Sequence, residues 1–194
     1  MSVTAGVIAV QGDVSEHVAA VERLAREAGH EVTAREVREA GVVPDCDWLA
    51  MPGGESTTIS RLLHEEGIAA EIVDHVGAGR PLLATCAGLI VAATDPNDER
   101  VESLGLVDVT VRRNAFGRQA DSFEAPLEVA GLDEPFHAVF IRAPVIDQVG
   151  DCEVLARWDG DPVAVRDGPV LATSFHPELT GDDRLHRLAF LDGE

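Results

Sequence analysis

Residues 82–93, LLATCAGLIVAA, form the longest apolar run of the chain. The run follows a helix-breaking segment at 77–81, so its first four residues predict a short strand in the centre of a sheet. Cys86 comes next, and the small residues Ala87 and Gly88 open an apolar stretch that predicts a helix. The run therefore predicts a buried strand that turns sharply into a helix, with a cysteine at the turn.

The N-terminal segments alternate between strand and helix patterns. Residues 5–10 and 31–37 predict strands, and 16–28 predicts a helix between them whose apolar residues share one face. This order is typical of a βαβ unit, in which the two strands pair in parallel.

A third strand is predicted at 48–51, and it ends in a Pro-Gly-Gly turn at 52–54. Ser56 and Thr57 can cap the helix that follows, and 68–76 continues as helix. This alternation predicts an α/β fold in which a doubly wound, mostly parallel sheet is flanked by helices.

After residue 104 the chain changes to short β-like segments. Turns at 159–160 and 167–168, both Asp-Gly, predict hairpins, and 178–191 predicts a final helix. Without an internal repeat or a polar linker, we expect one domain over 1–194, with an antiparallel β extension in the second half. The predicted strands of this half are 106–111, 127–129, 138–141, 154–158, 162–165 and 170–173.

The charge of the chain is strongly acidic. It has 35 acidic and 15 basic residues, a net charge of −20, and no lysine. This charge repels phosphate backbones and anionic membranes, which argues against a nucleic-acid or membrane partner. The acids are spread along the whole chain, a pattern typical of proteins from salt-loving organisms, where concentrated salt screens the repulsion.

No segment predicts a membrane span or a targeting signal. The run at 82–93 is shorter than the roughly 18 residues of a span, and the N-terminus lacks a basic segment followed by an apolar one. We therefore expect a cytoplasmic protein. Cys46, Cys86 and Cys152 form no CxxC pair, which argues against a disulfide framework and a zinc site. Cys46 and Cys152 are interpreted as buried apolar side chains.

The position of Cys86 favours a nucleophile. A side chain at a sharp strand-to-helix turn is held exposed, and the free N–H groups of the helix start favour a thiolate and an oxyanion. Buried cysteines in central strands are common, however, so the turn alone leaves a structural role open.

His176 and Glu178, in the segment SFHPE, follow a predicted strand 90 positions later. A free thiol is mostly protonated near neutral pH, so a histidine within hydrogen-bond reach raises its reactivity, and a carboxylate can orient the imidazole. A histidine after a strand is by itself more often a surface or capping residue. The remaining histidines lack a comparable setting and are given no role: His17, His30, His64, His75, His137 and His186.

Longer motifs extend this pattern over nearly the whole chain. In order they resemble the class I glutamine amidotransferases, and among them the glutaminase subunits of pyridoxal phosphate synthases. The resemblance implies hydrolysis of L-glutamine to L-glutamate and ammonia through a cysteine thioester, with Cys86, His176 and Glu178 as the catalytic triad. The motifs are QGD at 11–13 with EH at 16–17, PGGEST at 52–57, TCAG at 85–88, RNAFGRQ at 113–119 with DSFE at 121–124, FIRAP at 140–144 and SFHPEL at 174–179.

The resemblance also implies a glutamine pocket. The N–H groups of Gly54 and Ala87 are its implied oxyanion hole. Arginine suits the α-carboxylate of glutamine because it can donate two parallel hydrogen bonds. The family usually has glycine at position 84, and Ala84 should crowd the turn slightly. The implied substrate-binding residues are Gly54, Glu55, Ser56, Arg113, Ile141 and Arg142.

The implied partner is a TIM-barrel synthase subunit in a hetero-oligomer. That subunit combines a pentose phosphate, a triose phosphate and ammonia into pyridoxal phosphate. Pyridoxal phosphate is therefore the product of the complex, and no cofactor or metal is implied for this chain.

Three other interpretations stay open. A glutaminase subunit of another complex, such as imidazole glycerol phosphate synthase, shares the triad but should lack the motifs at 113–119 and 140–144. A flavodoxin-like cysteine hydrolase or chaperone usually has histidine directly after the cysteine, where this chain has Ala87. A non-enzymatic scaffold would leave the triad without a function. An assay of glutamate release in the presence of the synthase partner distinguishes these three alternatives from a glutaminase of that complex.

Overall fold

The chain alternates strands and helices up to residue 92 and is mainly β-structure after it. The structure is a computed structural model that describes residues 2–12, 14–113 and 122–192. The first half contains β1 (Ser2–Ile8), α1 (Ser15–Glu27), β2 (Glu31–Val37), η1 (Val43–Asp45), β3 (Trp48–Met51), α2 (Ser56–Glu65), α3 (Ile68–Gly77), β4 (Leu82–Thr85) and α4 (Ala87–Ala92). The second half contains β5 (Ala93–Asp95), β6 (Val107–Arg112), β7 (Ser122–Leu127), β8 (Phe136–Ile141), β9 (Val145–Val149), β10 (Glu153–Trp158), β11 (Asp161–Asp167), β12 (Val170–Thr173), η2 (Pro177–Leu179) and α5 (Arg184–Phe190).

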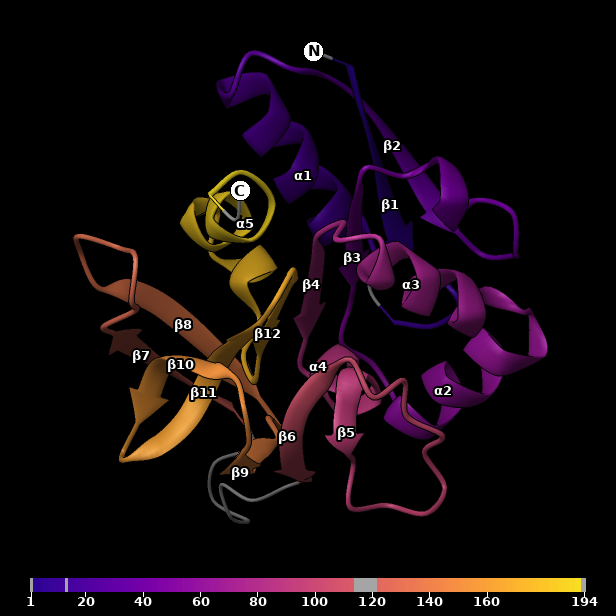
Figure 1. The fold of residues 1–194 in the computed structure, drawn as a ribbon. Coiled ribbons are helices and arrows are strands. Elements are labelled where there is room, and N and C mark those ends of the chain that lie inside the picture. The colour runs from indigo at the N-terminus through magenta and orange to yellow at the C-terminus, as the bar shows by residue number, and fades with distance from the viewer. Residues whose placement is uncertain (1, 13, 114–121, 193–194) are drawn as a thin grey trace.

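A seven-stranded sheet forms the centre of the molecule, in the order β10-β11-β12-β4-β3-β1-β2 (Figure 1). The strands from β12 to β2 pair in parallel, and β11 and β10 extend the sheet in antiparallel fashion. The described residues also form a three-stranded sheet, β5-β6-β9, and a two-stranded one, β7-β8. The predicted α/β fold with a late antiparallel extension is confirmed.

Alternating residues of the central strands face two separate apolar cores. In β3, Trp48 and Ala50 pack with α1, α5 and the β7-β8 pair, whereas Leu49 and Met51 pack with α2, α3 and α4. All four strand residues are buried because helices cover both faces of the sheet. This explains why the sequences of the central strands are continuous apolar runs.

Several predicted elements differ from the observed ones. The helix predicted at 178–191 is split into η2 and α5, because Gly181 has a positive φ of 70° and Asp182 Oδ1 accepts a hydrogen bond from the Arg184 N–H. Glu55, not Ser56 or Thr57, caps α2, since its carboxylate accepts from the Thr58 N–H. The strand expected at 127–129 shares only Leu127 with the observed β7, and β5 and β9 were not predicted.

The acidic residues lie mostly at the surface. Among the described residues, Glu178 and Asp183 are the buried acids, and Asp183 is held by two hydrogen bonds of 2.8 and 2.9 Å from Arg23. The exposed acids therefore face water and repel one another. No helix in the described part of the chain has the length and apolar character to cross a membrane.

Lowering the salt concentration is expected to destabilise the protein. The Debye length grows from roughly 3 Å at 1 M salt to roughly 10 Å at 0.1 M, so the surface acids then repel one another over longer distances. Thermal melts followed by circular dichroism should give a melting temperature that decreases steadily as the NaCl concentration is lowered. Sucrose is the control, because it favours the compact state without screening charge. A melting temperature that does not respond to salt would contradict the expectation.

Candidate active site

The strand-to-helix turn at Cys86 holds the thiol in a strained backbone conformation. Cys86 directly follows β4 and has φ 51° and ψ −108°, and α4 starts at the next residue. Such a conformation costs about 1–3 kcal/mol in a residue other than glycine. The Cys86 N–H donates a 2.8 Å hydrogen bond to the Thr173 carbonyl, which ties the turn to β12. The predicted turn is therefore observed.

Small residues let α4 pack closely against the sheet. A Cβ atom added to Gly88 would overlap the Met51 carbonyl oxygen, so only glycine permits this approach. Ala84 is fully buried and lies in register with Met51 on one side and Ala172 on the other. Its methyl group packs in the apolar core on the α4 side of the sheet, beneath the turn.

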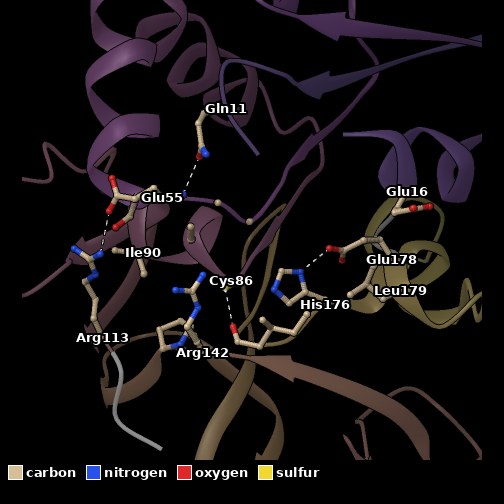
Figure 2. Close-up of a pocket in the computed structure, with 16 residues that line it drawn as sticks. Gln11, Glu16, Glu55, Cys86, Ile90, Arg113, Arg142, His176, Glu178 and Leu179 are labelled. Carbon is tan, nitrogen blue, oxygen red and sulfur yellow. Dashed lines mark hydrogen bonds and ion pairs between the residues drawn. The ribbon is translucent and has the colours of Figure 1, made fainter. Parts of the chain in front are cut away.

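The parallel pairing of β12 with β4 brings His176 to Cys86. Thr173 is in register with Thr85, so the residues that follow the two strands emerge side by side. The His176 Nδ1 atom lies 2.6 Å from Glu178 Oε1 (Figure 2). The three predicted triad residues thus meet at the carboxyl ends of adjacent strands.

Hydrogen bonds set the charges of this group. Burial lowers the pKa of His176, but hydrogen bonds to Cys86 and Glu178 outweigh burial and raise the pKa to about 10. Burial raises the pKa of Glu178, but hydrogen bonds from His17 and His176 outweigh it and hold the pKa far below its usual range. A charged carboxylate therefore holds a proton on His176, beside the Cys86 thiol.

A cavity of about 520 Å³ opens in front of the thiol. Its size suits a small-molecule ligand. It lies beyond the carboxyl ends of β3, β4 and β12, where ligands bind in sheets of this type. Every substrate-binding residue that the sequence predicted lines it, together with the triad and Ala87: Gly54, Glu55, Ser56, Arg113, Ile141 and Arg142.

The two predicted arginines are held differently. Arg113 donates to Glu55 at 3.0 Å (Figure 2) and to Asp98 at 2.7 Å, so two carboxylates already neutralise it. Arg142 is exposed, has a positive φ of 44°, and makes no ion pair with any other described residue. The sequence predicted similar positions for both and did not predict this difference.

Residues that the sequence did not place in the glutamine pocket lie in or behind the cavity wall. Gln11, in the loop after β1, accepts a 2.8 Å hydrogen bond from the Glu55 N–H through its side-chain oxygen (Figure 2). His17 lies behind Glu178, with Nε2 3.4 Å from Glu178 Oε1. Both residues belong to the motif at 11–17, and the position of this motif after a parallel strand was the available signal. The other unassigned lining residues are Glu16, Gly53, Ile90, Pro144 and Leu179.

Cys46 and Cys152 lie away from the cavity and are not disulfide-bonded. Cys46 is buried, and its thiol contacts the Val42 carbonyl at 3.3 Å. Burial raises the pKa of Cys46, and burial together with nearby acids raises that of Cys152 to about 11. Neither is poised as a nucleophile. The motif residues 114–121 lie outside the described residues.

Comparisons with known proteins agree with this geometry. Residues 7–192 match the SNO glutamine amidotransferase family. The chain is 71% identical over 193 residues to the "Pyridoxal 5'-phosphate synthase subunit PdxT" of Halobacterium salinarum, a match that covers 99% of this chain and 95% of that protein. It is 70% identical to the subunit of the same name from Haloarcula marismortui, with 99% and 98% covered.

Solved structures give the same picture. A structure described as "Crystal structure of glutamine amidotransferase" is 50% identical, covers 95% of this chain and 96% of its own, and superposes with a TM-score of 0.86. The structure of PurLQS from Thermotoga maritima, 17% identical, covers 100% of this chain and 94% of its own with a TM-score of 0.65, which supports the fold alone. The haloarchaeal relatives fit the acidic composition.

Proposed function

The chain belongs to the SNO glutamine amidotransferase family, and on this basis we propose how its residues act in the glutaminase subunit of a pyridoxal phosphate synthase. It hydrolyses L-glutamine to L-glutamate and ammonia. The observation that carries the residue assignment is the contact of His176 with both Cys86 and Glu178 at the edge of a cavity of about 520 Å³.

Catalysis starts with the Cys86 thiolate, which adds to the side-chain amide carbon of glutamine. The carbonyl oxygen becomes an oxyanion that the N–H groups of Gly54 and Ala87 stabilise. His176 then gives its proton to the amide nitrogen, the C–N bond breaks, and ammonia leaves a glutamyl thioester on Cys86.

The second half of the reaction uses the same residues in reverse. His176, now neutral, takes a proton from water, and the resulting hydroxide adds to the thioester carbon. The C–S bond breaks, glutamate leaves, and Cys86 returns as a thiolate beside a protonated His176. Glu178 keeps the imidazole oriented through its 2.6 Å contact with Nδ1.

Glutamine binds through its α-amino acid end. Arg142 is the arginine free to bind the α-carboxylate, because Arg113 is already paired with two carboxylates. Arg113 instead keeps Glu55 at the cavity, where Glu55 can accept a hydrogen bond from the α-ammonium group. Burial raises the pKa of Glu55, but hydrogen bonds from Thr57 and Thr58 lower it to about 2, so this carboxylate is charged at neutral pH.

The ammonia passes to a TIM-barrel synthase subunit in a hetero-oligomer. The support is the full-length similarity to subunits named as parts of pyridoxal 5'-phosphate synthase. Glutamate release by the chain mixed with the synthase of the same organism, in concentrated salt, tests the proposal. Absence of glutamine-dependent glutamate release in that mixture would refute it.

Substitutions in the triad should follow a definite order. His176→Ala removes the proton donor, so kcat should fall nearly as far as when the nucleophile is lost. Glu178→Gln only weakens orientation, and its loss of kcat should be smaller by roughly 10- to 100-fold. Because Glu178 holds the proton on His176, the pKa of His176 should also fall in this variant, which NMR titration of the imidazole measures. A larger loss for Glu178→Gln would show that the orienting group is misassigned.

A further inference from the structure

Two buried histidines lie behind the triad and have no part in the mechanism above. His17 is in the first turn of α1 and His186 is in α5, and neither has exposed surface. Their ring centroids are 6.0 Å apart, with the ring planes at 61°. Burying an imidazole is unfavourable unless its polar atoms find partners.

One nitrogen of His17 touches both the nucleophile strand and the triad carboxylate. Its Nε2 atom lies 3.2 Å from Thr85 Oγ1 and 3.4 Å from Glu178 Oε1. Thr85 directly precedes Cys86, and Glu178 Oε1 is the same oxygen that contacts His176 Nδ1. One oxygen of the Glu178 carboxylate is therefore in contact with two imidazoles.

The charge of Glu178 decides which group carries the proton in its contact with His17. An ionised carboxylate has no proton to give, so the proton of this contact must be on His17 Nε2. At 3.4 Å the contact is longer than an ordinary hydrogen bond and weaker than the 2.6 Å contact to His176. The buried setting, where the dielectric constant is low, preserves part of the attraction.

We propose that His17 is a positioning residue of the triad, whose Nε2–H holds the Glu178 carboxylate ionised and aimed at His176. The inference rests on the proposed glutaminase function and adds a fourth residue behind the three that touch the reacting atoms. It acts through Glu178, because a carboxylate that is free to turn or to take up a proton orients the imidazole less well.

His186 offers a matched control. In the described structure neither of its ring nitrogens has a hydrogen-bond partner. Burial first, and then the nearby His17, lower its pKa to about 3, so the ring is neutral and serves as packing. The other charged groups around this cluster are Glu178, Asp182 and the Arg23–Asp183 pair.

The test compares His17→Leu, His17→Gln and His186→Leu with the wild type, each as the full chain with its synthase in concentrated salt. The glutamine side chain can place an N–H donor near the Nε2 position, whereas leucine cannot. His17→Leu should lower kcat by about 10- to 100-fold with KM little changed. His17→Gln should recover most of that loss, and His186→Leu should keep kcat near that of the wild type.

The pH dependence of Cys86 alkylation by iodoacetamide gives a second readout that needs no partner. A less firmly held Glu178 stabilises the His176 imidazolium less, so thiolate formation should require a higher pH in His17→Leu. The midpoint should stay near that of the wild type in His17→Gln and His186→Leu.

The possible results separate the two proposals. Equal kcat and an equal alkylation midpoint in His17→Leu and the wild type would overturn the positioning role while leaving the glutaminase intact. Equal losses in His17→Leu, His17→Gln and His186→Leu would also overturn it, because packing would then explain the effect. A wild type that releases no glutamate would refute the function itself. If His17→Leu does not fold, His17→Gln becomes the deciding variant. The proposal then requires that His17→Gln folds and keeps most of kcat. A large loss of kcat in this variant would overturn the proposal.

Discussion

Cys86→Ala is expected to abolish glutamate release, with a loss in kcat of roughly 10,000-fold or more, because no other group near the cavity can form the thioester. The fold should persist. Cys86 is 8% exposed, and alanine removes one sulfur atom without adding bulk to the turn. The variant should therefore bind glutamine and melt near the wild-type temperature.

Cys46→Ala and Cys152→Ala are the matched controls for this experiment. Both residues lie outside the cavity, so their variants should keep the wild-type kcat even where Cys46→Ala lowers stability by opening a small buried space. Mass spectrometry of the wild type quenched during turnover should find the glutamyl adduct on Cys86. More than a small percentage of wild-type activity in Cys86→Ala would rule out this residue as the nucleophile.

The second large effect is expected from the synthase subunit. We expect the isolated chain to be a poor glutaminase and the synthase to raise its rate by about 100- to 1000-fold, the usual effect of one oxyanion donor. Hydrolysis of glutamine by the isolated chain would waste ammonia. An active site that becomes complete only when the synthase binds would avoid this loss. The loop at 52–56 is the conformational element in this proposal, because a turn of one peptide group could present or withdraw the Gly54 N–H.

The structure supports a specific connection to this loop. Gln11 holds the Glu55 N–H at 2.8 Å, and Gly54 adopts a φ of 151°, where an added Cβ atom would overlap the Gln11 side chain. Movement of the segment after β1 would therefore act on the Glu55 peptide group, which directly follows the peptide group that carries the Gly54 N–H. Gln11→Ala should weaken this coupling and reduce the activation by the synthase.

Steady-state glutamate production by the chain alone and with saturating synthase, both in concentrated salt, measures the activation. Cys86→Ala with synthase is the control for glutaminase contamination of the partner. Equal rates with and without synthase would rule out the switch and leave Cys86 as the nucleophile.

The local sequence determined the elements that have a clear apolar pattern between turn signals. The strands at 31–37, 48–51, 82–85 and 170–173 have the predicted bounds. The last three are buried on both faces and are therefore short apolar runs between turn signals, whereas the strand at 31–37 lies at the edge of the sheet and is partly exposed. The turn at Cys86 was predictable for a similar reason, since small residues after a strand permit a close strand-to-helix turn. These features follow from hydrophobic pattern and backbone freedom.

Only the tertiary structure decided how distant segments meet. The pairing of β12 with β4 places His176 beside Cys86, and the packing of α1 and α5 places His17 and His186 behind Glu178. The different pairing of Arg113 and Arg142 is equally non-local, because it depends on Asp98 and Glu55 from other parts of the chain. The local sequence around a histidine is the same whether its side chain faces water or a buried carboxylate. Tertiary packing sets the burial and the neighbouring charges of the imidazole, and these determine its function in the site.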